Sequence, residues 1–421
     1  MSPRTRRAST IAVTVGLGLA FTLACGGEKT VQLGAVLPLS GNAQVYGQAI
    51  KKGIDLAMKE TQDLTDLPRG ATVTMSIADS ASDPQQAVQE LRVALSAGAI
   101  AVIGGVTSPE ALAMVPVANE ADRVLLSPSA SSQELSGISR NFYRIFPSAE
   151  AEAVALSNHT VNTLQVKALA ILADATAFGQ GLAKNFQENF ERAGGTVTET
   201  LTFEPDTTDL SALAQQVVAL QRQAARAEGG QQAGFAVFVA AAGDDLANAL
   251  RTLRQQGYEA RILASSALAS LDVLRAAGEA AEFVYFAQTP FDPEDADEPM
   301  ASFAAAYQEE YGETPTFYAA HGYDAVMVLL QALREADSTD AIDFRTGMRS
   351  IANLPGVTGS IQFRENGDVQ RFMRVHLVSE GKPRDFEDYM SGRRQEIIEQ
   401  QKEIERRRRE LERRLQQGTG S

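Results

Sequence analysis

The chain has 421 residues, of which 44% are hydrophobic and 22% charged, a composition typical of globular proteins and sufficient for two hydrophobic cores. Its formal net charge is −15, and it becomes −18 when the three arginines of the first 25 residues are removed. Such an acidic body argues against nucleic-acid binding. It does not exclude an anionic ligand, because local helix termini decide that.

The first 25 residues are typical of an export signal. Three arginines, at positions 4, 6 and 7, precede a short apolar run, 11–23, that is too short for a comfortable membrane span. Cys25, the single cysteine of the chain, follows this run and resembles the lipidated cysteine of a bacterial lipoprotein. We therefore expect residues 1–25 to be a lipoprotein signal peptide, with an ordinary secretory signal as the alternative. Export with one cysteine also means that no internal disulfide stabilises the fold.

From residue 31 onward, short apolar runs alternate with segments of helical periodicity. The predicted strands are 31–37, 73–78, 101–106, 124–126, 166–173, 235–240, 262–264 and 283–286. The predicted helices are about 46–60, 84–97, 109–121, 149–163, 179–193, 210–226 and 244–256. This alternation predicts an α/β fold of parallel sheets covered by helices on both faces. A break at Phe142–Pro147 indicates a crossover and favours two doubly wound lobes.

Two predicted strands end in loops rich in hydroxyl groups. The strand 101–106 leads into Ser108, which we expect to cap a helix that begins at Pro109, and the strand 124–126 leads into Ser127–Ser131. Ligands of open α/β sheets bind outside the carboxyl ends of the strands, and a helix N-terminus suits a carboxylate. The pattern therefore predicts an anion site, with two ordinary strand-to-helix turns as the alternative.

The segment 385–421 differs from the rest of the chain. Its nine acidic and nine basic residues balance, and i,i+4 pairs such as Glu403 with Arg407 favour a helix. Isoleucine or leucine repeats every seven residues at 397, 404 and 411, although Arg408 interrupts the second apolar column of a coiled coil. The segment is predicted to be a solvated single helix, with a self-association or partner helix as the alternative.

Several motifs occur in an order that resembles the periplasmic branched-chain amino-acid binding proteins of ABC transporters. They cover roughly residues 31–380, which is more specific than any single motif. The motifs are LGAVLPLSG with Tyr46 and Gly47, DSASDPQQAV, IGG-x-TS with SPSA-xxx-EL, FGQGLAKNF, AGEAAEFVYF and GVTGSIQFRENGD.

The resemblance implies a type I periplasmic binding protein, or Venus flytrap, with two doubly wound parallel-sheet lobes and a charged C-terminal helix. Chain crossings are implied near residues 147, 289 and 357. Lobe 1 is then expected to comprise 31–147 and 289–356, and lobe 2 to comprise 148–288 and 357–384.

The resemblance also implies ligand-binding residues. Ser108 and Ser131 correspond to the groups that hold the ligand carboxylate, and the Ser129 carbonyl to the one that receives its ammonium. Phe178 corresponds to an aromatic residue of lobe 2. Tyr46 is a further candidate, for which core packing is the alternative.

Two positions of this implied site depart from the family. Ala242 replaces an aromatic residue, and Ser266 replaces the acid that pairs with the ligand ammonium. Because a buried ammonium without a counter-charge is costly, the departure favours a larger or less cationic carboxylate over a simple branched-chain amino acid. The alternative is an acid elsewhere in the sequence, namely Asp174, Asp244 or Asp245.

Nothing in the sequence indicates an enzyme, a metal or a cofactor. His159, His321 and His376 lie in different motifs, and we find no GxSxG, P-loop or GxGxxG signature. We expect an extracytoplasmic, lipid-anchored binding protein that closes on a small carboxylate-bearing solute and docks on ABC permease and ATPase subunits. The alternative is a sensory module of the same fold coupled to a membrane receptor.

Overall fold

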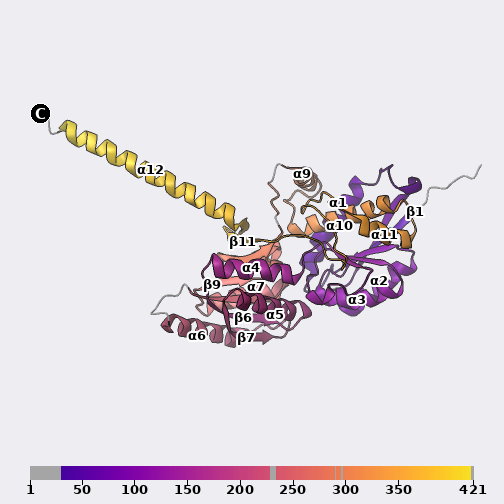
Figure 1. Ribbon diagram of the computed structural model, residues 1–421, viewed down its shortest axis with the longest axis horizontal. Helices are drawn as coiled ribbons and strands as arrows, with labels where there is room; N and C mark the ends of the chain where they lie inside the picture. The colour runs from indigo at the N-terminus through magenta and orange to yellow at the C-terminus, as the bar shows by residue number, and fades with distance from the viewer. Residues whose placement is uncertain (1–29, 228–233, 290, 295–296, 419–421) are drawn as a thin grey trace, which may run out of the picture.

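The computed structural model describes residues 30–227, 234–289, 291–294 and 297–418, which form two α/β lobes and a projecting C-terminal helix (Figure 1). The predicted signal peptide and Cys25 lie outside the described residues. None of the helices in the described part of the chain is long and apolar enough to cross a membrane.

Lobe 1 is built on a parallel sheet of five strands in the order β2-β1-β3-β4-β5. Its central strands are short aliphatic runs, buried on both faces, as expected for a parallel sheet between helices. The strands are β1 (Thr30–Leu37), β2 (Thr72–Asp79), β3 (Ala101–Gly104), β4 (Val124–Ser127) and β5 (Phe142–Arg144).

Side-chain alternation divides the core of lobe 1 into two layers. Ile103 and Leu126 face one group of helices, whereas Val102 and Leu125 face the other. The first group is α1 (Gln44–Glu60), α10 (Phe317–Ala336) and α11 (Ala341–Ser350), and α9 (Met300–Tyr311) packs in a separate cluster against α1 and α10. The second is α2 (Pro84–Ser96) and α3 (Ser108–Glu120).

Lobe 2 contains a seven-stranded sheet in the order β12-β11-β10-β9-β8-β6-β7. Strands β6 to β10 are parallel, and β11 and β12 extend one edge in antiparallel fashion. The strands are β6 (Ala168–Asp174), β7 (Thr196–Phe203), β8 (Phe235–Ala240), β9 (Arg261–Ala264), β10 (Val284–Gln288), β11 (Arg374–Ser379) and β12 (Lys382–Asp385).

Helices also cover both faces of this second sheet. Val237 and Ile262 pack in one layer and Phe238 and Leu263 in the other. The helices of lobe 2 are α4 (Ala149–Asn162), α5 (Ala177–Arg192), α6 (Ser211–Ala227), α7 (Gly243–Gln255) and α8 (Leu271–Ala277). The predicted fold class is thereby confirmed, and each predicted helix coincides with an observed one to within a few residues.

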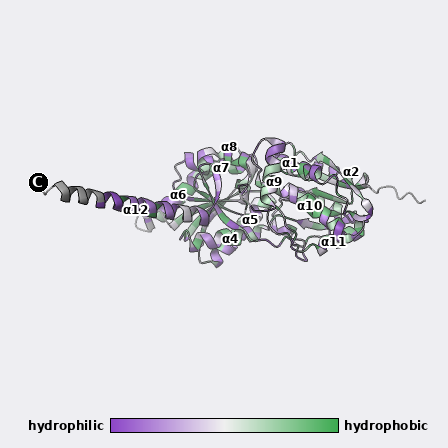
Figure 2. Ribbon diagram, turned by 90° about the horizontal axis from the view of Figure 1, so that it is seen from above, coloured by the Kyte–Doolittle hydropathy of each residue, from purple (hydrophilic) through white to green (hydrophobic). Residues whose placement is uncertain are grey.

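Helix α12 (Phe386–Gly418) confirms the predicted C-terminal helix and extends away from lobe 2 (Figures 1 and 2). Its first turn is anchored, because Phe386, Tyr389 and Met390 pack on the lobe 2 core. Beyond that turn Ile397 and Ile404 are exposed, and Glu403 pairs with Arg407 as predicted. The helix thus lies in solvent over most of its described length.

The structure corrects the expected position of the last chain crossing. Segment 361–369 stays with lobe 1, because Asp368 pairs with Arg144 of β5 and the ring of Phe363 packs on Tyr143. The chain therefore crosses into lobe 2 after Val369, not near residue 357. Strands β5, β7, β11 and β12 were also not predicted, because β7 and β12 are mostly exposed or half-buried and β5 and β11 bury only three consecutive residues each, which gives a weak apolar signal.

Candidate ligand-binding site

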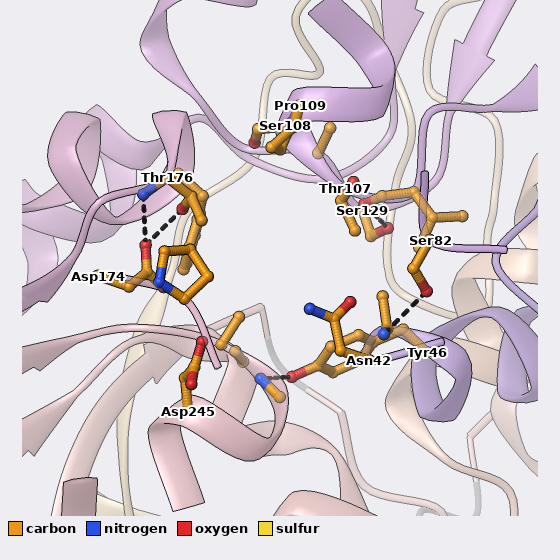
Figure 3. A pocket seen from close by; sticks show the side chains of 18 of the residues that line it. Asn42, Tyr46, Ser82, Thr107, Ser108, Pro109, Ser129, Asp174, Thr176 and Asp245 are labelled. Carbon is orange, nitrogen blue, oxygen red and sulfur yellow. Dashed lines mark hydrogen bonds between the residues drawn. The ribbon is translucent and has the colours of Figure 1, made fainter. Parts of the chain in front are cut away.

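A cavity of about 290 Å³ lies between the lobes, bordered by loops at the carboxyl ends of strands from both sheets (Figure 3). Such a position is the usual ligand site of open α/β sheets. The structure places all seven expected site residues on its lining: Tyr46, Ser108, Ser129, Ser131, Phe178, Ala242 and Ser266.

The start of α3 forms part of the lobe 1 wall of the cavity. The N-cap residue of this helix differs from the predicted one. Thr107, not Ser108, is the N-cap, and a capping box joins its hydroxyl to the backbone N–H of Glu110. The Glu110 carboxylate in turn accepts from the Thr107 backbone N–H at 3.0 Å. Because Thr107 performs the capping, the Ser108 side chain is available for other contacts.

Two buried hydroxyl groups of lobe 1 are suited to a ligand carboxylate. Ser108 Oγ accepts from the Ser132 backbone N–H at 3.1 Å, which leaves its own proton to donate. The Ser131 hydroxyl has no protein partner among the described residues, although Ser131 is only 2% exposed. Ser129 differs, because its hydroxyl donates to the Val106 carbonyl at 2.7 Å. The start of α3 and the loop after β4 therefore each offer one hydroxyl donor to the cavity, Ser108 and Ser131.

Changing Ser108 and Ser131 together to alanine is expected to weaken binding of a carboxylate ligand by about 1–3 kcal/mol, because each hydroxyl would bond a charged group. Isothermal titration calorimetry measures the loss. Ser96→Ala, an exposed serine of α2 outside the cavity, is the control. Unchanged affinity in the double variant would contradict the assignment of these hydroxyls.

The lobe 2 wall is acidic. Asp174, Asp206, Asp244 and Asp245 line the cavity, whereas its described lining contains no lysine, arginine or histidine. Asp174 ends β6, and its carboxylate accepts from the Thr176 backbone N–H at 3.0 Å. Helix α7 begins beside them without a side-chain cap. The cavity therefore contains acids, although Ser266 occupies the position where the family has its ammonium-pairing acid.

These carboxylates affect one another. Burial raises the pKa of Asp245 to about 6, and repulsion from Asp174, Asp206 and Asp244 adds to this effect. The hydrogen bond from the Asp206 backbone N–H acts in the opposite direction and lowers the pKa. Burial likewise raises the pKa of Asp174. A cationic group placed between them would relieve this repulsion.

A hydrogen bond joins the lobes at the edge of the cavity. Tyr46 of α1 accepts at its hydroxyl oxygen from the Gly243 backbone N–H of α7, at 2.6 Å (Figure 3). Gly243 has a φ of +55°, a region that favours glycine. Tyr46 thus links the two lobes, and its packing on Tyr318 explains its burial as well.

A buried acid, Glu152, lies behind Ser266, the serine that replaces the ammonium-pairing acid of the family. Ser266 begins a short 3-10 turn, η4 (Ser266–Ala269), and its N–H and hydroxyl both donate to the Glu152 carboxylate, at 2.8 and 2.7 Å. Glu152 could not be identified from the sequence, because it lies 114 residues from Ser266 along the chain and nothing distinguishes it from other acids of a helix. The aromatic residues Phe146 and Tyr318 of the lining were also not identified from the sequence.

The three histidines lie away from the cavity lining. His321 is buried against Phe146 and Phe317, and burial lowers its pKa to about 3. His159 packs on Phe386, and His376 lies in β11. Within the described ranges, no cluster of three or more His, Cys, Asp or Glu side chains could hold a metal ion.

A model of the periplasmic binding protein family matches residues 30–382. The chain belongs to the periplasmic binding protein family. It is 26% identical over 357 residues to Leu/Ile/Val-binding protein homolog 1 of Brucella abortus, an alignment that covers 84% of this chain and 92% of the relative.

Solved structures of binding proteins share this architecture. A leucine-binding protein of Thermotoga maritima superposes with a TM-score of 0.76 at 25% identity, covering 84% of this chain and 97% of the other. A solute-binding protein of Rhodopseudomonas palustris, solved in complex with benzoate, superposes with a TM-score of 0.74 at 17% identity. That superposition covers 85% of this chain and 95% of the other. As a periplasmic binding protein, the chain is an extracytoplasmic substrate-binding protein and not an enzyme.

Proposed function

We propose that this protein is the lipid-anchored solute-binding component of an ABC transporter and that its lobes close on an α-amino acid. The ligand carboxylate would bond the Ser108 and Ser131 hydroxyls of lobe 1, and its ammonium would face the acids of lobe 2. Closure would create the surface that the permease and its ATPase subunits recognise. Family membership does not favour the sensory alternative.

The separation of donors and acids across the cavity carries this proposal. Hydroxyl donors lie on one wall, four aspartates lie on the other, and no basic side chain of the described lining offsets those aspartates. A zwitterion satisfies both walls, whereas a carboxylate without an amino group would leave the acidic wall unpaired in a closed cleft. The sequence favoured a less cationic carboxylate, whereas this distribution of charges favours a ligand that carries an amino group.

The fold by itself does not distinguish these ligand classes. One structural neighbour is a leucine-binding protein, and another was solved with benzoate. Selection must therefore come from the side chains at the cavity. Phe178, Phe146 and Tyr318 provide an apolar surface beside the charged groups, which suits an amino acid with an apolar side chain.

A thermal-shift panel tests the ligand class. Leucine, isoleucine and valine are compared with their deaminated counterparts 4-methylpentanoate, 3-methylpentanoate and 3-methylbutanoate. A ligand present at 100 times its Kd stabilises the folded state by about 2.7 kcal/mol, so the melting temperature should rise with the amino acids. Benzoate extends the panel to aromatic acids. Equal or greater stabilisation by the acids that lack an amino group would contradict the proposal.

Cys25→Ser is expected to release the protein from the membrane, because acyl chains on Cys25 would be its anchor after signal removal. Membrane fractionation and mass spectrometry of the mature N-terminus check this expectation. Thr30→Ser, an equally small change at the start of β1, is the matched control and should stay in the membrane fraction. Acylation of the Cys25 variant at the wild-type level would rule out Cys25 as the lipid site.

A further inference from the structure

Glu152 is a buried carboxylate for which the described part of the chain provides no basic partner. It lies in the first turn of α4 and is fully buried, and both of its oxygens accept from Ser266. No lysine, arginine or histidine forms an ion pair with it among the described residues. Burial raises the pKa of Glu152 to about 7, against the lowering effect of the two Ser266 bonds. Burying a carboxylate that is hydrogen-bonded but lacks a counter-charge costs free energy.

Ser266 connects this acid to the cavity. The serine lines the cavity and is itself only 2% exposed. Since its hydroxyl proton is donated to Glu152, its oxygen retains lone pairs that can accept a hydrogen bond but has no proton left for an anion. The negative charge behind it strengthens that acceptor, because charge-assisted hydrogen bonds are the stronger ones.

A purely structural role explains Glu152 less well. The α4 N-terminus favours an acid, but exposed Glu150 in the same turn supplies one without a desolvation cost. Joining α4 to the loop after β9 would need one neutral hydrogen-bond pair, not a buried charge. Tyr318, also on the cavity lining, is 5% exposed, and its hydroxyl has no protein partner in the described structure. Tyr318 lies close enough to feel the charge of Glu152, and its hydroxyl is one further polar group on the cavity lining.

We propose that Glu152 is a positioning residue that supplies the counter-charge for a cationic amino group of the ligand through the hydroxyl of Ser266. The arrangement replaces an acid on the cavity wall by a serine with an acid behind it. This inference rests on the proposed function, since it assigns a partner to the ammonium of the amino acid.

The test measures the preference for leucine over 4-methylpentanoate by isothermal titration calorimetry in the full chain. Glu152→Gln keeps the shape of the side chain and removes its charge. We expect the preference to fall by about 10- to 100-fold, the range that a hydrogen bond to a charged group provides. Glu150→Gln, the same change on the exposed face of the same helical turn, should leave the preference at the wild-type value.

A rescue separates this role from a structural one. Glu152→Gln combined with Ser266→Asp returns a carboxylate to the cavity wall and should restore the preference for leucine. A merely structural loss would not be repaired by that second change. Ser266→Ala gives an independent measurement, because it breaks the connection while Glu152 stays in place, and it should also lower the preference.

The outcomes distinguish the two proposals. Wild-type protein that binds 4-methylpentanoate as tightly as leucine overturns the proposed function and this inference together. If the wild type prefers leucine and Glu152→Gln keeps that preference, only the role of Glu152 is overturned. Loss of the preference in Glu152→Gln without recovery in the double variant overturns it as well.

Discussion

Gly53→Ala is expected to destabilise the protein by about 3 kcal/mol, at the upper end of the usual cost of overpacking a core. Helices α1 and α10 cross closely at this point. A Cβ on Gly53 would lie 1.8 Å from the Ala319 carbonyl oxygen, and one on Gly322 would lie 2.1 Å from the Ile50 carbonyl oxygen. Since the obstructing atoms belong to the backbone, a rotamer change cannot relieve the clash, and the helices must separate.

Equilibrium urea unfolding measures this loss, with Gly392→Ala as the control. Gly392 lies in α12, and no atom within 4 Å would meet an added Cβ there. Because alanine favours the helix over glycine by about 1 kcal/mol, the control should be neutral or slightly stabilising. A Gly53→Ala protein as stable as the control would mean that α1 and α10 are not in close contact.

Arg144→Met is expected to cost about 3–5 kcal/mol, the range for breaking one side of a buried ion pair. Arg144 is fully buried, and its Nε donates to Asp368 at 2.7 Å. Its Nη1 donates to the Ser132 carbonyl at 2.8 Å and to that of Ala130 at 3.4 Å. The guanidinium therefore holds the loop that carries Ser131, so ligand affinity should fall together with stability.

Arg140→Met is the matched control for Arg144→Met. Arg140 is exposed, and its ion pair with Asp122 spans 3.4 Å, so its loss should cost less than about 1 kcal/mol. Calorimetric melting gives the stability of both variants, and titration with leucine gives their affinity. Similar melting temperatures for the two variants would show that the Arg144 pair contributes no more than a surface contact.

Eight strands and the helices α1 to α7 could be predicted because they depend on local patterns, whereas β5, β7, β11, β12 and α8 to α11 were not predicted. Fully buried strands such as β3 and β4 are continuous apolar runs, and helices such as α2 show helical periodicity with Asp83 as a cap. The charged C-terminal helix was predictable for the same reason, since its acid–base pairs are four residues apart. Motif order added the two-lobe fold and seven of the residues that line the cavity.

The charge of the binding site depended on tertiary structure. Ser266 and Glu152 are 114 residues apart, and Arg144 and Asp368 are 224 apart, so no local pattern relates them. The sequence alone showed a serine where an acid was expected, and the folded chain brings Glu152 behind that serine and four aspartates to the same lobe 2 wall of the cavity. Short-range periodicity specifies which face of an element is buried, whereas the neighbours that a side chain meets across a cavity follow from how separate elements pack.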